Sequence, residues 1–150
     1  MVLAQRGNHL VALCRDLVVL LVQGRTIIKN RLAIDDMEEE DTLRRFLSIV
    51  SSEGCKTFIV HARKAWLKGL SPKQNRDVPP LNYELVYQMK REFPDLEIII
   101  NGGIETLEAC DQHLEHVDGV MVGREAYHNP YHLIQVDKSF YNDYRLPLTR

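Results

Sequence analysis

Cysteine, long apolar runs and an excess of charge of either sign are all scarce in this sequence of 150 residues. The three cysteines, Cys14, Cys55 and Cys110, lie far apart, are odd in number and form no CxxC pair. That pattern argues against a disulfide scaffold and a structural zinc site, and it favours a reducing, cytoplasmic setting. No stretch reaches the roughly 18 to 20 apolar residues of a membrane span, so we expect no membrane partner.

Charge is balanced, because 19 Lys and Arg stand against 21 Asp and Glu, for a formal net charge of −2. A chain without a global basic field has to bind nucleic acid through a local patch. The content of 45% hydrophobic and 27% charged residues excludes collagen-like, low-complexity and wholly disordered proteins. The length corresponds to one globular domain.

Strand-like and helix-like segments alternate along the chain. A helix is expected over 8–22, with the apolar run 17–22 as its buried end and Gly24 as its C-cap. Strands are expected over 26–34, 57–61, 97–101 and 119–122, and helices over 35–54, 82–92 and 105–115, with a long loop over 62–81. This alternation predicts right-handed βαβ units and a parallel sheet. Four such strands correspond to half of a (β/α)8 barrel or to a small open sheet, and both outer strands would expose unpaired edges.

Polar residues or glycines occupy the C-terminal ends of all four strands, where parallel α/β folds carry their functional groups. They are Lys29 with Arg31, His61 with Arg63 and Lys64, Asn101-Gly102-Gly103, and Gly123-Arg124. Glycine turns ahead of a helix let backbone amides approach an anion, and Arg124 adds a guanidinium. We therefore expect a phosphate at these last two strand ends, the alternative being that both are only tight turns.

Lys29 and His61 are candidate ligand contacts of a different kind. Lys29 interrupts an apolar strand, where a lysine is costly unless it meets an anion or a polar ligand. The alternative is an exposed lysine on an edge strand. His61 can donate to a ligand carbonyl or phosphate from its strand end, although a lone histidine is more often structural.

The segment 62–76 combines basic residues with Trp66 and contains no acidic residue. Its basic residues are Arg63, Lys64, Lys68, Lys73 and Arg76. Basic groups interleaved with an aromatic ring suit a phosphate backbone with base stacking. The alternative is a solvated loop with Trp66 in the core. His113 and His116 lack a third ligand nearby, so we predict no metal site.

Four stretches of the chain resemble the tRNA-dihydrouridine synthases, specifically the synthase A subfamily. They cover 28–36, 58–76, 100–104 and 118–127, and the resemblance extends over roughly residues 10–136. The segment beginning His61-Ala62-Arg63-Lys64 is specific to that subfamily. The opening residues 1–9 do not resemble the family, which suggests a truncated reading frame or a new start.

The resemblance implies an FMN-dependent, NADPH-driven reduction of the C5=C6 bond of uridine in the tRNA D-loop, on a (β/α)8 barrel with a C-terminal helical domain. It implies that Lys29 and His61 contact FMN and that Lys73 and Arg76 contact tRNA. It also implies that the FMN phosphate is held by Asn101, Gly102, Gly103, Gly123 and Arg124.

The chain matches only strands five to eight of that barrel. We expect a partial FMN-binding barrel domain of about four β/α units over 1–136, lacking the N-terminal half, and a remnant of the helical region over 137–150. The family pattern Lys-His-Arg-Ile-Gly-Ile-Asp reads Lys29-Asn30-Arg31-Leu32-Ala33-Ile34-Asp35 here. A homodimer of half barrels could restore eight strands.

The family's catalytic cysteine stands in a Gly-Cys-Pro context that this sequence lacks. Cys14 falls in the helix after that position, so we assign no catalytic residue. Losing a general acid typically lowers the rate by about two to four orders of magnitude, and we expect a weakly active or inactive chain. The alternatives are a non-catalytic FMN- or tRNA-binding remnant and a different phosphate-binding barrel enzyme with a small metabolite substrate.

Overall fold

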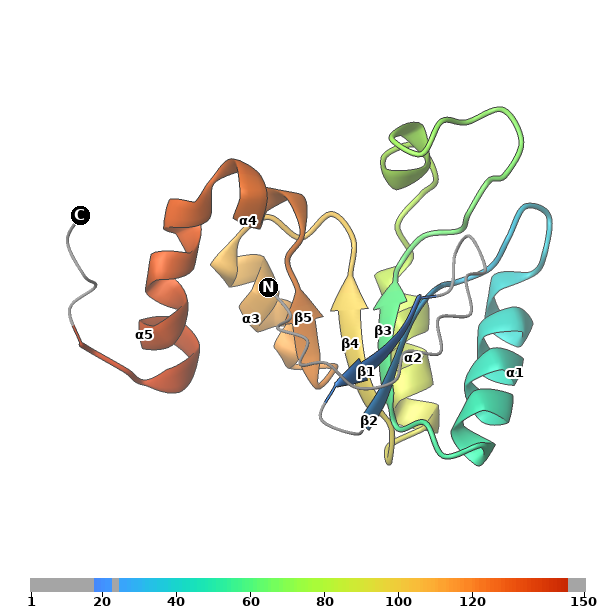
Figure 1. Cartoon of the computed structure of the whole chain (residues 1–150), viewed down its shortest axis with the longest axis horizontal. Coiled ribbons are helices and arrows are strands. Elements are labelled where there is room, and N and C mark those ends of the chain that lie inside the picture. The colour runs from blue at the N-terminus through green and yellow to red at the C-terminus, as the bar shows by residue number, and fades with distance from the viewer. Residues whose placement is uncertain (1–17, 23–24, 146–150) are drawn as a thin grey trace.

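A sheet with strand order β1-β2-β3-β4-β5 forms the centre of the computed structural model, which describes residues 18–22 and 25–145 (Figure 1). Four strands run parallel: β2 (Arg25–Arg31), β3 (Thr57–His61), β4 (Glu97–Asn101) and β5 (Gly119–Met121). They are joined through α1 (Glu39–Ser52), α2 (Tyr83–Glu92) and α3 (Leu107–Leu114). The predicted parallel α/β fold with four β/α units is thus confirmed.

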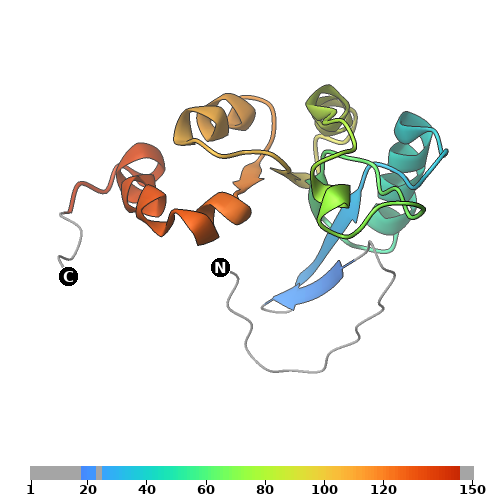
Figure 2. The ribbon, with the colours of Figure 1, turned by 90° about the horizontal axis from the view of Figure 1, so that it is seen from above.

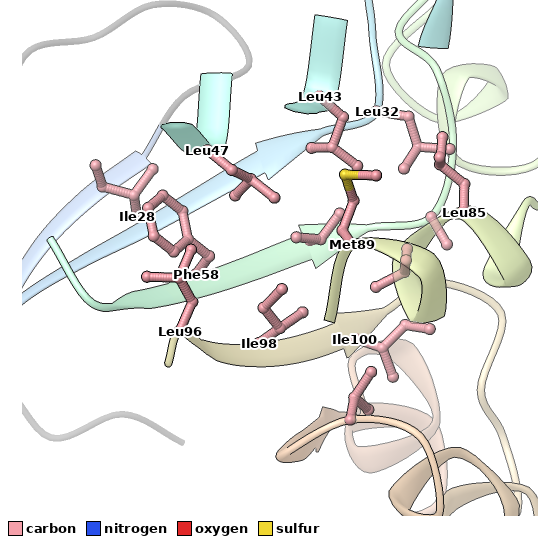
Figure 3. Packing of buried hydrophobic residues seen from close by; sticks show 14 of the residues in the cluster. Ile28, Leu32, Leu43, Leu47, Phe58, Leu85, Met89, Leu96, Ile98 and Ile100 are labelled. Carbon is pink, nitrogen blue, oxygen red and sulfur yellow. The ribbon is translucent and has the colours of Figure 1, made fainter. Parts of the chain in front are cut away.

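The three connecting helices lie on one side of the sheet, as the view from above shows (Figure 2). Alternate strand residues face them and form the core, with Phe58, Ile98 and Ile100 fully buried (Figure 3). Val60 is fully buried as well. Helices α1 and α2 contribute buried apolar residues to the same cluster: Leu43, Leu47, Leu85, Val86 and Met89. The other face of the strands is therefore left for the remaining alternate residues, among them Lys29 and His61.

Polar side chains fix where the helices begin. The Glu38 carboxylate accepts from the backbone N–H groups of Glu40 and Asp41 at 3.0 and 2.6 Å, which lowers the Glu38 pKa. Asn82 and Thr106 cap α2 and α3 in the same way. The acidic run 35–41 was expected to open the first helix, but the helix begins only at Glu39. Asp35 lies before it in the left-handed region, with φ of 46°.

The expectation of a helix over 8–22 is wrong for residues 18–22. They form strand β1 (Val18–Val22), which pairs antiparallel with β2. A short apolar run does not by periodicity alone distinguish a helix from a strand, and pairing satisfies the backbone groups at the β2 edge. The first parallel strand is consequently not a sheet edge. Residues 8–17, including Cys14, and Gly24 lie outside the described residues.

Three short helical elements follow β5 and lead away from the sheet (Figure 1): α4 (Arg124–His128), η2 (Pro130–Gln135) and α5 (Val136–Tyr141). Phe140 packs against the core cluster, whereas Tyr127 and Tyr141 are largely exposed. Within the described ranges, no helix is long and apolar enough to cross a membrane.

Candidate functional site

The strand register alone places four of the strand-end side chains in one row across the sheet. Arg31 pairs with His61, His61 with Asn101, and Asn101 with Met121. Paired residues of neighbouring strands point to the same face, and Lys29 lies two residues before Arg31 on that face. The row forms at the C-terminal edge of the parallel strands, where the sequence predicted the functional groups.

A cavity of about 760 Å³ opens at this edge, a size typical of small-molecule sites. Its lining includes all seven residues predicted to bind the cofactor: Lys29, His61, Asn101, Gly102, Gly103, Gly123 and Arg124. Arg76 also lines it, whereas the exposed Lys73 does not. The structure therefore brings the predicted cofactor residues together, and of the two predicted tRNA contacts it places Arg76 at the cavity and Lys73 just outside it.

Lys29 is held by two neighbours across the sheet. Its Nζ donates to Asn101 Oδ1 at 2.7 Å and to Met121 Sδ at 3.5 Å. Burial, and secondarily the charge of Arg31, lowers the Lys29 pKa to about 8. Because β2 is paired on both sides, the alternative of an exposed lysine on an edge strand does not hold.

His61 is half-buried and is held as a neutral imidazole. Burial lowers its pKa to about 3, and the cations Arg31, Lys29, Arg63 and Arg124 act in the same direction. Its Nε2 is buried, and no hydrogen-bond partner for it exists among the described residues. Buried polar atoms in native proteins nearly always have a partner, so this nitrogen is suited to a polar ligand atom in the cavity.

The turn at Gly102 and Gly103 needs glycine at both positions. Their φ angles of 120° and 67° lie in the left-handed region. A Cβ on Gly102 would stand 3.1 Å from His61 Nε2, and one on Gly103 would stand 2.8 Å from a Leu81 methyl group. The Tyr83 hydroxyl donates to the Gly102 carbonyl at 2.7 Å and holds the turn against α2.

The second glycine turn is joined to the long loop by an ion pair. Gly123 precedes α4, and open space surrounds the position that a Cβ would take there. The Arg124 guanidinium lies 2.7 Å from the Asp77 carboxylate, and both side chains are nearly half exposed. Arg124 thus lines the cavity while contacting the loop that closes one side of it.

The loop 62–81 lies over the strand ends (Figure 1), anchored by hydrogen bonds although most of its residues between Leu67 and Val78 are exposed. Arg31 donates to the carbonyls of Lys64 and Asn75 at 2.9 and 3.0 Å. The Asn75 side chain accepts from the Trp66 backbone N–H at 2.8 Å, and the Asp35 carboxylate accepts from that of Leu67 at 2.7 Å. The Trp66 ring is half-buried.

The family model of dihydrouridine synthase matches residues 5–147. The chain belongs to the dihydrouridine synthase family. The resemblance drawn from the strand-end motifs is confirmed, and an unrelated phosphate-binding barrel enzyme is no longer an alternative. The four β/α units agree with the C-terminal half of the (β/α)8 barrel of this family.

Curated relatives of this chain are named tRNA-dihydrouridine(20/20a) synthase. The relative from Shewanella oneidensis is 54% identical over 87% of this chain and 39% of its own length. The relatives from Pasteurella multocida and Pseudomonas aeruginosa are 52% and 50% identical, over 89% and 94% of this chain. The chain spans about two fifths of the length of these relatives.

Sequence reasoning missed three residues that shape this candidate site. Asp77 pairs with Arg124, and Leu81 and Tyr83 pack on the glycine turn. A signal existed for Asp77, because it is the first acidic residue after the acid-free segment 62–76. No local pattern indicated Leu81 or Tyr83, since their contacts depend on how α2 packs beside β4.

The remaining candidate groups have structural partners. The His113 ring contacts the Tyr87 hydroxyl through Nδ1 at 2.6 Å, and His116 stacks on the Tyr87 ring at 4.4 Å. No group of three or more metal-ligating side chains gathers within the described part of the chain. Cys55 and Cys110 are buried, burial raises the pKa of both thiols, and neither lines the cavity.

Proposed function

We propose that the cavity binds FMN and that the chain functions as an FMN-dependent tRNA-dihydrouridine synthase. Such an enzyme uses NADPH to reduce the C5=C6 bond of uridine in the tRNA D-loop. The observation that carries the proposal is one cavity lined by both glycine turns, Arg124, Lys29 and a neutral His61. The name that the relatives carry, tRNA-dihydrouridine(20/20a) synthase, supports the same reaction.

The residues that line the cavity fit this cofactor. Backbone amides at Gly102, Gly103 and Gly123, together with Arg124, suit a phosphate group, because such amides and a guanidinium all donate to oxygen anions. His61 Nε2 lacks a partner within the described ranges and suits a polar atom elsewhere on the cofactor. Lys29 supplies a positive donor in the same cavity. When bound, FMN supplies the hydride that reduces the uracil ring.

The proton that completes the reduction has no donor among the described cysteines. Cys55 and Cys110 lie outside the cavity, and their raised pKa keeps both thiols protonated in apolar surroundings. This favours weak or absent reduction by the chain alone. The second candidate function, binding of FMN or tRNA without turnover, is favoured by the same observation.

The long loop is proposed as the tRNA contact. Arg76 is the last residue of the short helix η1 (Gln74–Arg76), lines the cavity and is exposed. Lys73 directly precedes η1 and is also exposed. A base that reaches a flavin has to leave its stack, so contacts to the backbone are needed beside the cavity. Arg63 is already engaged, because it donates to the carbonyls of Asp77 and Pro79.

FMN binding is tested by titrating FMN with the full chain and following flavin fluorescence. Arg124→Ala removes the guanidinium and should weaken FMN binding about 10- to 100-fold, because hydrogen bonds to charged groups contribute about 1.5–3 kcal/mol. Arg91→Ala is the matched control, because Arg91 pairs with Glu84 on the exposed side of α2. A folded chain that does not bind FMN would refute the proposal.

tRNA binding is tested by a filter assay over a range of salt concentrations. Lys73→Ala and Arg76→Ala should each weaken binding and reduce the salt slope by about one counterion. Lys56→Ala is the control, since Lys56 lies exposed at the opposite edge of the sheet. Unchanged binding in both loop variants would remove the loop from the proposal.

Catalysis and assembly need separate measurements. Dihydrouridine formation from chain, tRNA, FMN and NADPH would contradict the expectation of weak activity, whereas binding without turnover would support it.

A homodimer that closes eight strands through β2 has to displace β1 from that edge. Light scattering at twice the monomer mass supports the dimer, and a monomeric mass excludes it.

A further inference from the structure

The Asn101 amide is engaged at both ends within the sheet. Its Nδ2 donates to the Met121 carbonyl at 2.7 Å, and its Oδ1 accepts from Lys29 Nζ at 2.7 Å. Only one of the two amide orientations satisfies both contacts, because a flipped amide would direct its NH2 group at an ammonium. The backbone of β5 therefore dictates that the amide oxygen faces Lys29.

This arrangement spans three strands. Lys29 is in β2, aligned with Ile59 of β3 and through it with Ile99 of β4. Asn101 lies two residues after Ile99 in β4 and points to the same face, so the Lys29 side chain has to cross β3 to reach it. A long flexible ammonium stem has many conformations, and a fixed acceptor across the sheet selects one of them.

The contacts leave Lys29 able to act on a ligand. An ammonium has three N–H donors, and Asn101 Oδ1 and Met121 Sδ accept two hydrogen bonds from it. Both acceptors are neutral, so the positive charge is oriented without being cancelled. An aspartate at position 101 would instead form an ion pair with it.

We propose that Asn101 is a positioning residue that aims Lys29 into the cavity and does not itself hold the cofactor phosphate. This revises the assignment of Asn101 to the phosphate, which rested on its place beside the glycine turn. The phosphate is then left to Gly102, Gly103, Gly123 and Arg124. The inference deepens the proposed FMN site and rests on it only for the nature of the ligand.

The first test needs no ligand. The pH dependence of Lys29 acylation by acetic anhydride, resolved by mass spectrometry, reports the Lys29 pKa in the full chain. Asn101→Asp should raise that pKa from about 8 by about one to three units, because a carboxylate would replace the amide at 2.7 Å from Nζ. Asn101→Ala should lower it, because the charged form loses an acceptor. A Lys29 pKa that moves in neither variant would overturn the inference.

The second test compares FMN with riboflavin, which lacks the phosphate. If Asn101 acts through Lys29, Asn101→Ala should weaken both ligands by the same factor, about tenfold, and the double variant with Lys29→Ala should bind as Lys29→Ala does. A loss confined to FMN would mean that Asn101 holds the phosphate, which overturns the inference. If the wild-type chain binds neither flavin, the proposed function fails while the acylation test still decides the role of Asn101. Circular dichroism establishes that each variant is folded.

Discussion

Acid should destabilise this chain through His61 well before its carboxylates protonate. Free histidine titrates near 6.5, whereas burial among cations lowers the His61 pKa to about 3 in the folded chain. Below pH 6.5 the unfolded chain therefore binds a proton at this position that the folded chain does not. Stability consequently falls as the pH drops through 6.5 and continues to fall until about pH 3.

The magnitude follows from the width of that window. Each pH unit inside it lowers the free energy of unfolding by about 1.36 kcal/mol. Near pH 5 the histidine contribution is thus a loss of about 2 kcal/mol relative to neutral pH, a large fraction of the stability of a typical domain. FMN that contacts the neutral imidazole should raise the stability at both pH values by mass action and leave this loss unchanged.

Urea unfolding at about pH 7 and about pH 5, followed by circular dichroism, measures this loss. His61→Gln replaces the imidazole by a neutral amide, so its stability should change less between the two conditions by about 2 kcal/mol. His128→Gln, at an exposed position of α4, should keep the wild-type dependence. Equal losses in the wild type and in His61→Gln would refute the argument that the folded chain holds His61 in its neutral form.

Two further predictions concern the turn and the core. Gly103 and Gly54 both have positive φ, but only a methyl group at position 103 would meet another side chain, Leu81 at 2.8 Å. Gly103→Ala should therefore lower the free energy of unfolding by more than Gly54→Ala does. Gly103→Ala should also weaken FMN binding. Urea unfolding of the two variants compares them, and equal losses would show that Leu81 yields without strain. Phe58→Ala should lower the free energy of unfolding by about 3–5 kcal/mol, as large-to-small core changes do. Ile49→Ala, at a position 53% exposed, should change it by less than about 0.5 kcal/mol, and a similar loss in both would contradict the assigned core.

Local patterns were sufficient for most of the architecture. Near-continuous apolar runs act within a few residues, so β3, β4, β5 and α2 were predicted nearly to their observed ends, whereas the strand expected over 26–34 ends at Arg31. The run 17–22 was misassigned because its strand pairing depends on β2 and not on its own periodicity.

The strand-end members of the candidate site were also determined by sequence, since parallel strands present their C-terminal ends at one edge whatever the details of packing. What each side chain does there was decided only by tertiary structure. Asn101 meets Lys29 across β3, and Arg124 meets Asp77 of the loop. Residues separated by tens of positions acquire such contacts through strand register and loop docking, and no local pattern encodes them. The sequence by itself therefore determined which groups gather at the cavity, and the fold decided which of them face a ligand and which orient a neighbour.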